Sequence, residues 1–194
     1  VLWVAALSLC RIGLSKNATT TMTSTLQSAS HNISTAFGDS SASYGDDIFP
    51  PLQGCGQGNG AGPAMWAVSS AVLLTIMRNS GFGTDLTSAL SHSAISLAGF
   101  AFVDDTDLVT FHQDTLQLTE EIMSNMQESI NRWEGGLKLT GGAIVPEKSW
   151  VYALDFRFDD SGKWHYKRPD KIPHQFTVPD HNNIRQPLEK IAPE

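Results

Sequence analysis

The sequence is poor in cysteine, in basic residues and in long apolar runs. Its 194 residues include two cysteines, Cys10 and Cys55, which stand far apart and outside any Cys-x-x-Cys pattern. This spacing argues against a thiolate metal centre. It leaves one disulfide possible but not indicated, so a reducing compartment is expected.

Basic residues are outnumbered by acidic ones. Thirteen Lys and Arg stand against 20 Asp and Glu, which gives a net charge of −7 at pH 7. A protein that grips nucleic acid by itself usually shows a basic face, because phosphate neutralisation supplies much of the affinity. The composition therefore indicates either a partner other than nucleic acid or a basic surface on parts of the protein outside this chain.

No apolar run is long enough to suggest a membrane span. Residues 1–10 are apolar but too short to cross a bilayer, and they lack the basic residue and the cleavage pattern of a signal peptide. A buried helix is the better interpretation. Hydrophobic residues make up 41% of the chain, so we expect one globular domain with no membrane partner and an intracellular location, in the nucleus or the cytoplasm.

Residue spacing predicts helices mixed with antiparallel hairpins. Helices are expected over residues 2–12, 15–30, 64–79 and 118–133, the last broken at Gly135-Gly136 and Gly141-Gly142. Strands are expected over 31–37, 95–102 (buried), 108–111 and 150–158, with 163–166 pairing back through a turn at 159–162. Residues 38–51 and the glycine-rich 54–63 are expected as loops, and the Pro-rich stretch from Lys167 onward as an extended or poorly ordered tail. This order of elements predicts the α+β class.

Two adjacent carboxylates, Asp104 and Asp105, interrupt an otherwise apolar hairpin. Such a pair is costly, because the two charges repel one another and resist burial. A divalent cation offsets that cost, and Mg²⁺ prefers hard oxygen ligands and pairs with substrate phosphates. Two such ions can activate an attacking hydroxyl and stabilise a leaving pyrophosphate. A solvated Asp-Asp turn is the alternative interpretation, and Asp107 fits turn solvation.

Three segments resemble reverse transcriptases, and they come in that family's order. Phe102-Val-Asp-Asp105 is similar to the aromatic-x-Asp-Asp signature. Upstream, Gly54-Cys-Gly-Gln57-Gly58 with Pro63 and Trp66 resembles the Gln-Gly motif and the helix after it. Downstream, Gly136-Leu137 through Lys148 resembles the family's Gly-Leu…Lys segment. The resemblance covers roughly residues 50–155 and is to retroelement enzymes of the cellular, non-retroviral kind.

The resemblance implies an incomplete right-hand polymerase palm, with helices packed on one face of an antiparallel sheet. The palm would cover residues 1–166, with some fingers-side elements at its N-terminal end, followed by a tail over 167–194. The implied activity is RNA-directed DNA synthesis by two-metal nucleotidyl transfer. Its partners would be an RNA template, a DNA primer, deoxynucleoside triphosphates, and fingers and thumb segments outside this chain.

Site roles follow from the same resemblance, position by position. Asp104 and Asp105 would be the catalytic ligands of two Mg²⁺ ions, with Mn²⁺ as a possible substitute. Lys148 would assist pyrophosphate departure, and a solvated strand-edge lysine is its alternative. Gln57 and Gly58 would line the incoming nucleotide and the template, where glycine allows close approach to the backbone. Phe102 would share that role and pack under the carboxylates.

Departures from the family leave other interpretations open. The family's further metal-binding aspartate is expected before Val1, so this chain alone is expected to be inactive. A non-catalytic palm-like remnant or interaction module is one alternative, and an RNA-dependent RNA polymerase is another. Phe102 speaks against the second, because viral enzymes favour Gly before Asp-Asp.

Two further patterns are decoys. Tyr44-Gly-Asp-Asp47 imitates the viral polymerase motif, but no apolar strand flanks it and Pro50-Pro51 follows, so a surface loop is expected. The alternating glycines at 56, 58, 60 and 62 lack the Gly-Lys-Ser/Thr of a phosphate-binding loop, and the six histidines form no close pair for zinc.

Overall fold

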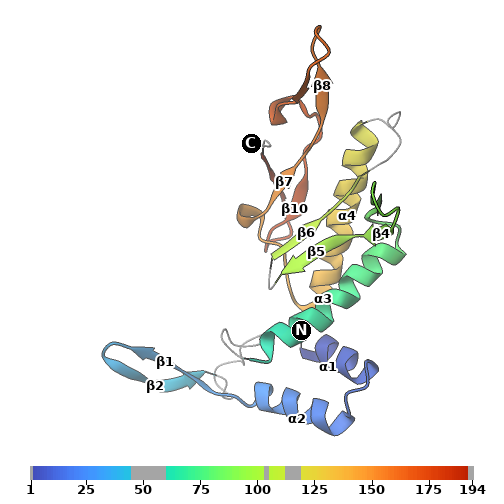
Figure 1. Cartoon of the computed structure of the whole chain (residues 1–194). Coiled ribbons are helices and arrows are strands. Elements are labelled where there is room, and N and C mark those ends of the chain that lie inside the picture. The colour runs from blue at the N-terminus through green and yellow to red at the C-terminus, as the bar shows by residue number, and fades with distance from the viewer. Residues whose placement is uncertain (1, 45–59, 103–104, 112–118, 192–194) are drawn as a thin grey trace. The chain divides into compact units, whose positions relative to one another are not determined.

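The structure, a computed structural model, describes residues 2–44, 60–102, 105–111 and 119–191 (Figure 1). The chain divides into two compact units, Val1–Val72 and Leu73–Glu194. Four α-helices and a set of short strand pairs in the described residues confirm the α+β class. None of the described helices is long and apolar enough to cross a membrane.

The first unit holds two predicted helices, α1 (Leu2–Arg11) and α2 (Lys16–Gln27). The chain leaves α1 through Gly13, whose φ of 107° suits glycine. Ser15 then caps α2, accepting a hydrogen bond from the Ala18 amide at 3.2 Å. The third helix, α3 (Gly62–Asn79), begins in this unit and ends in the second.

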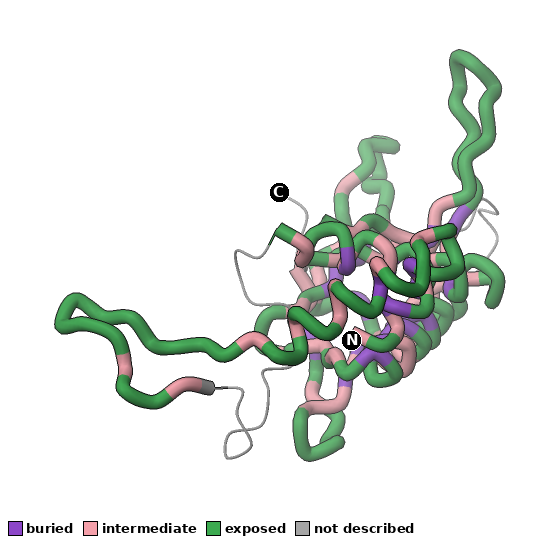
Figure 2. Tube along the Cα trace, turned by 90° about the horizontal axis from the view of Figure 1, so that it is seen from below, coloured by how far each residue is buried: buried purple, intermediate pink, exposed green. Residues whose placement is uncertain are grey.

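A hairpin in the first unit corrects part of the sequence interpretation. The predicted strand is present as β1 (His31–Thr35), but residues 38–44, expected as loop, form its partner β2 (Gly38–Tyr44). The polar residues of this hairpin bond across it: the Ser40 hydroxyl accepts from the Ile33 amide at 3.0 Å, at an irregularity in the register. Hydroxyl-rich residues form strands here because the described hairpin is exposed along almost its whole length (Figure 2).

The second unit contains α4 (Thr119–Thr140), which overturns a predicted helix end. The helix passes through Gly135-Gly136 without a break and ends at Thr140, just before Gly141, whose φ is 81°. A Cβ at Gly136 would lie 2.9 Å from the Leu73 Cδ2 atom of α3. Glycine at this position lets α3 and α4 approach closely, which offsets its weak helix propensity.

The described strands of the second unit pair two by two, so the single antiparallel sheet expected of a palm is not seen among them. The antiparallel pairs are β3 (Thr84–Thr87) with β4 (Ala94–Leu97), β5 (Gly99–Phe102) with β6 (Asp105–Leu108), β8 (Phe156–Phe158) with β9 (Trp164–Tyr166), and β10 (Thr177–Pro179) with β11 (Arg185–Pro187). The remaining pair, β7 (Trp150–Tyr152) with β12 (Glu189–Ile191), is parallel. The strands predicted over 95–102 and 150–158 are each divided in two, and the first is largely exposed rather than buried.

The core of this unit draws half its residues from the stretch expected to be a tail. Its buried members are Met123, Ile130, Val151, Ala153, Ile172, Phe176, Val178 and Leu188. The expectation of an extended or poorly ordered segment from Lys167 onward is therefore wrong for residues 167–191. The widely spaced apolar residues of this segment are buried in the core, and the polar residues between them remain at the surface.

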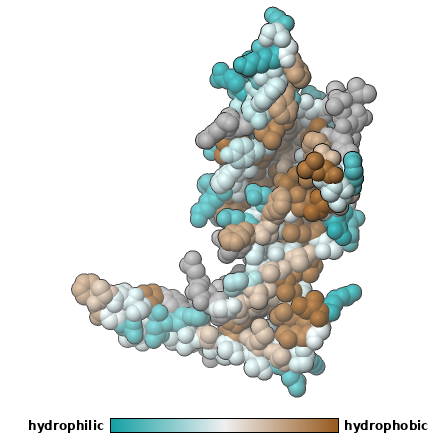
Figure 3. All heavy atoms as spheres, in the orientation of Figure 1, coloured by the Kyte–Doolittle hydropathy of each residue, from teal (hydrophilic) through white to brown (hydrophobic). Residues whose placement is uncertain are grey.

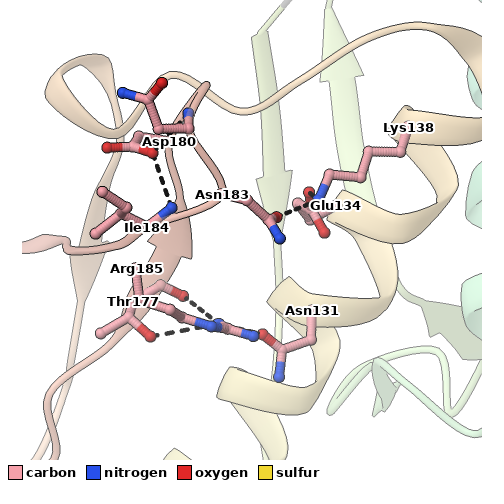
Figure 4. A network of polar contacts seen from close by, with 9 residues as sticks. Asn131, Glu134, Lys138, Thr177, Asp180, Asn183, Ile184 and Arg185 are labelled. Carbon is pink, nitrogen blue, oxygen red and sulfur yellow. Dashed lines mark hydrogen bonds and ion pairs between the residues drawn. The ribbon is translucent and has the colours of Figure 1, made fainter.

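Polar contacts also fasten this segment to α4. The Gln127 side chain bonds both ways with the Thr177 backbone, accepting from its amide at 2.8 Å and donating to its carbonyl at 2.9 Å. Further along the helix, Arg185 donates to the Asn131 amide oxygen at 2.8 Å and Lys138 donates to the Asn183 side chain (Figure 4).

Candidate catalytic hairpin

The β5–β6 hairpin carries the described part of the predicted metal-binding sequence. Its register pairs Phe102 with Asp105 and Phe100 with Asp107. Residues directly opposite one another, and residues two apart on one strand, share a face. These four side chains therefore lie on one face, and all four are exposed.

The opposite face anchors the hairpin to the core. Leu108 packs against the buried cluster that includes Met123 and Val151. Below the hairpin, the Val109 amide donates to the Ala98 carbonyl at 3.2 Å. The hairpin is thus held firmly at its base while its other face remains open.

Gly99 is required by the close pairing of the two strands. A Cβ at this position would collide with the backbone carbonyl oxygen of Asp107. Since that oxygen belongs to the main chain, a side chain could be accepted only by shifting the ladder. The glycine therefore fixes the register that sets Phe102 opposite Asp105.

Asp107 belongs to the same face as Asp105, which the sequence interpretation missed when it assigned Asp107 to turn solvation. Two residues of a strand separate their Cα atoms by roughly 7 Å. Within the part of the chain that the structure describes, neither carboxylate takes part in an ion pair or a hydrogen bond. A pattern in the sequence could have revealed this shared face. Two phenylalanines and two aspartates alternate with other residues on either side of a two-residue connection, at Phe100, Phe102, Asp105 and Asp107.

Phe102 does not pack beneath Asp105 but lies beside it on the open face. Its side chain is 79% exposed and Phe100 is 57% exposed, so the expectation of a buried Phe102 is wrong. The reason is the register, which turns both phenylalanines to the open face together with the aspartates. An exposed ring beside a carboxylate is available to contact a ligand bound on that face.

Lys148 closes a short 3₁₀ turn, η1 (Pro146–Lys148), immediately before β7. The Lys148 amide donates to the Val145 carbonyl at 3.1 Å, and Lys148 is exposed. Val151, three residues further on, belongs to the core cluster against which Leu108 packs. Lys148, through the strand β7 that follows it, and Asp105, through its own strand β6, are therefore attached to one core.

Three predicted site residues lie outside the described residues: Asp104, Gln57 and Gly58. Their placement on the hairpin face stays a prediction. The decoy Gly45-Asp-Asp47 also lies outside, although Tyr44 before it ends β2 rather than standing in a loop.

The donor set suits a hard cation only in part. Carboxylate oxygens are the ligands that Mg²⁺ prefers, and it often takes one or two of them together with water and phosphate oxygens. Asp105 and Asp107 offer such oxygens on an open face. Over the described residues, however, no group of three His, Cys, Asp or Glu side chains is placed to hold a metal ion. A metal site on this hairpin would need further ligands beyond Asp105 and Asp107.

Comparison with protein-family models finds no matching family. Comparisons with curated proteins and with solved structures also find no match. The resemblance to reverse transcriptases thus depends on the three ordered motifs, and the α+β class depends on the structure.

Proposed function

We propose that this chain carries the catalytic palm segment of an RNA-directed DNA polymerase of a non-retroviral retroelement. The observation that carries the proposal is the hairpin in which β5 ends at Phe102 and β6 begins at Asp105. In the sequence, the Gln57-Gly58 motif precedes this hairpin and the Lys148 segment follows it. A β-hairpin with an acidic connection is a compact way to offer carboxylates to a cation without burying them. The proposed DNA synthesis takes place inside the cell, in the nucleus or the cytoplasm.

The proposed chemistry is attack of a primer 3′-hydroxyl on a deoxynucleoside triphosphate, guided by an RNA template. Asp104 and Asp105 would hold two Mg²⁺ ions, which when bound activate the hydroxyl and stabilise charge on the departing pyrophosphate. Lys148 would present its ammonium group to the pyrophosphate oxygens as negative charge develops there. Gln57 and Gly58 would line the nucleotide.

Primer extension on an RNA template tests the proposal in the full-length protein that contains this chain. Replacing Asp104 by Asn should reduce synthesis at least about a thousandfold, which corresponds to about 4 kcal/mol of activation free energy. The reason is loss of a charged oxygen ligand, which removes both hydroxyl activation and charge stabilisation. Thermal melting of each variant serves as the folding control.

A matched variant separates catalysis from general loss of acidity. Asp46→Asn in the decoy motif removes the same charge and should change synthesis by less than about tenfold, roughly 1.4 kcal/mol. If Asp46→Asn silences the protein while Asp104→Asn does not, the catalytic assignment is wrong. If the unaltered full-length protein extends no primer, the non-catalytic palm-like module is the better description.

A further inference from the structure

The β8–β9 hairpin presents a second exposed face, and it is almost entirely aromatic. Its register pairs Phe156 with Tyr166 and Phe158 with Trp164, so these four side chains, here called the aromatic face, lie on one side. Arg157 and its partner His165 lie on the other. Phe158 is 73% exposed and Trp164 is 53% exposed, although large aromatic side chains are usually well covered.

The aromatic face continues the outer side of the preceding strand. Val151 and Ala153 are buried in the core, whereas Tyr152 and Leu154 between and after them are exposed. The alternation therefore reaches from β7 into β8 with its larger side chains outward. This is the reverse of what core packing alone selects, so the exposed rings need another reason.

Ring contacts hold the aromatic face in a fixed arrangement. Phe156 meets Trp164 edge to face at a centroid distance of 5.8 Å and Tyr166 at 5.2 Å. Trp164 and Tyr166 also meet edge to face, at 5.3 Å. Because Phe156 contacts both neighbours, the rotamers of Trp164 and Tyr166 are set before any ligand arrives, which lowers the entropy lost on binding.

Basic residues are frequent in the sequence next to this face, in an otherwise acidic chain. Residues 157–171 contain five Lys and Arg and three Asp, whereas the whole chain has a net charge of −7. Among the described residues, the side chains of Lys163 and of Arg157, on the opposite face, form no ion pair, and the exposed Arg168 is paired with the exposed Asp170 at 3.1 Å. Exposed ion pairs of this kind are weak and can be exchanged for a phosphate. Figure 3 shows hydrophilic atoms beside hydrophobic ones at this end of the unit, at the top of the view.

Asp159, which directly follows Phe158, is occupied within its own turn. Asp159 accepts hydrogen bonds from the Ser161 hydroxyl at 2.6 Å, the His165 ring at 2.9 Å and the Lys163 amide at 3.0 Å. Its charge is therefore partly neutralised by local donors, and it repels an approaching anion less than a free carboxylate does.

From these observations we propose that the aromatic face of the β8–β9 hairpin binds unpaired bases of a single-stranded polynucleotide, with Lys163 and Arg168 contacting its phosphates. Flat aromatic rings stack on any base, and flanking cations track the backbone. A Pro-rich peptide also uses aromatic surfaces, but it gives no role to the neighbouring cations. The inference concerns a site separate from Asp104 and Asp105 and does not depend on polymerase activity.

Fluorescence anisotropy with short labelled oligothymidine and oligouridine tests this proposal, using the purified chain without Mg²⁺ or nucleotides. Both strands should bind, at least about tenfold more tightly than a blunt duplex, and should quench tryptophan fluorescence. Trp164→Ala should weaken binding about tenfold, because it removes a stacking ring. Trp164→Phe should restore most of that loss. Lys163→Ala should lower the dependence of log Kd on log salt by about 0.7, the value for one single-strand phosphate contact.

Phe37→Ala is the matched control, since Phe37 is a fully exposed phenylalanine at the turn of the β1–β2 hairpin. It should leave binding unchanged. The proposal is overturned if Trp164→Ala behaves like Phe37→Ala, if the duplex binds as tightly as the single strands, or if a Pro-rich peptide binds and the oligonucleotides do not. Circular dichroism confirms that each variant is folded. Binding without Mg²⁺ reports on this face and primer extension reports on Asp104, so the two proposals can fail separately.

Discussion

The β5–β6 hairpin sets each phenylalanine opposite an aspartate, whereas the β8–β9 hairpin sets each phenylalanine opposite another aromatic residue. Both hairpins obey the same two-residue alternation and both leave one face open. The chemistry offered by the open faces differs. One combines rings with carboxylates and suits a cation bound to a substrate, and the other combines rings with neighbouring cations and suits a polyanion.

The two hairpins also differ in what holds them. Leu108 of β6 packs against the core, so the first hairpin is stabilised from beneath. The second is stabilised by its own ring contacts and by the Asp159 turn, with its strand residues mostly exposed. A face supported by the core keeps its geometry without a ligand, and a self-supported hairpin is expected to open locally at lower free energy.

The largest expected effect comes from the core beneath the first hairpin. Phe176 is fully buried, so Phe176→Ala should lower the free energy of unfolding by about 3–5 kcal/mol. Phe158→Ala makes the same chemical change on the exposed aromatic face and should cost less than about 1 kcal/mol. Urea unfolding of both variants measures the difference. Equal losses would mean that residues 167–191 do not contribute to the core.

Each hairpin contains a glycine, but for a different reason: Gly99 is required by lack of space and Gly162 by its backbone conformation. Gly99→Ala forces a Cβ against the Asp107 carbonyl oxygen and should cost about 3 kcal/mol. Gly162, in the turn of the second hairpin, has a φ of 80° but open space around it. Gly162→Ala should therefore cost about 1 kcal/mol, and Gly162→Asn less, because Asn tolerates a positive φ.

Chemical denaturation of these three variants and of Gly99→Asn tests the distinction. Asn should rescue only at position 162, since backbone conformation is the constraint there and space is the constraint at position 99. A Gly99→Ala protein as stable as the unaltered chain would show that the β5–β6 ladder shifts readily, and the pairing of Phe102 with Asp105 would lose its significance.

Local sequence patterns predicted the elements whose causes are local. The helix predicted over 15–30 is present as α2 at Lys16–Gln27, where Ser15 caps it, and α3 ends near Gly81 as expected. The β8–β9 hairpin follows from the Asp159 turn. A hairpin with an acidic connection was likewise expected at β5–β6, but its second strand was predicted over 108–111 and is found at Asp105–Leu108.

Features that depend on distant contacts were not predicted. The passage of α4 through Gly136 depends on Leu73, which is far away in sequence. The order of the segment after Lys167 depends on isolated apolar residues such as Phe176 meeting α4, a pattern without helical or strand periodicity. For the candidate site, the shared face of Asp105 and Asp107 required the register, which alternation alone suggested but did not fix.

The smallest expected effect is a pH dependence confined to the second hairpin. The Ser161 hydroxyl, the His165 ring and the Lys163 amide donate to Asp159 and lower its pKa from the usual 3.8 to about 2. A carboxyl whose pKa is depressed in the folded state stabilises that state above its unfolded pKa, and it loses this contribution as the pH falls through the folded pKa. The stabilisation from Asp159 should therefore be complete above about pH 5 and should disappear between about pH 4 and pH 2.

Asp159→Asn should lower the melting temperature near pH 7 by a small amount, because the carboxylate lies at the surface and solvent screens its interactions. The difference from the unaltered chain should shrink steadily across the same acidic range. Asp160→Asn, at the exposed neighbouring position, should give a difference that does not vary in this way. Tryptophan fluorescence, which includes the Trp164 signal, offers a local readout beside the melting temperature. If the Asp159→Asn difference stays constant down to pH 2, the turn does not hold the aromatic face, and the contrast with the core-supported β5–β6 hairpin must be abandoned.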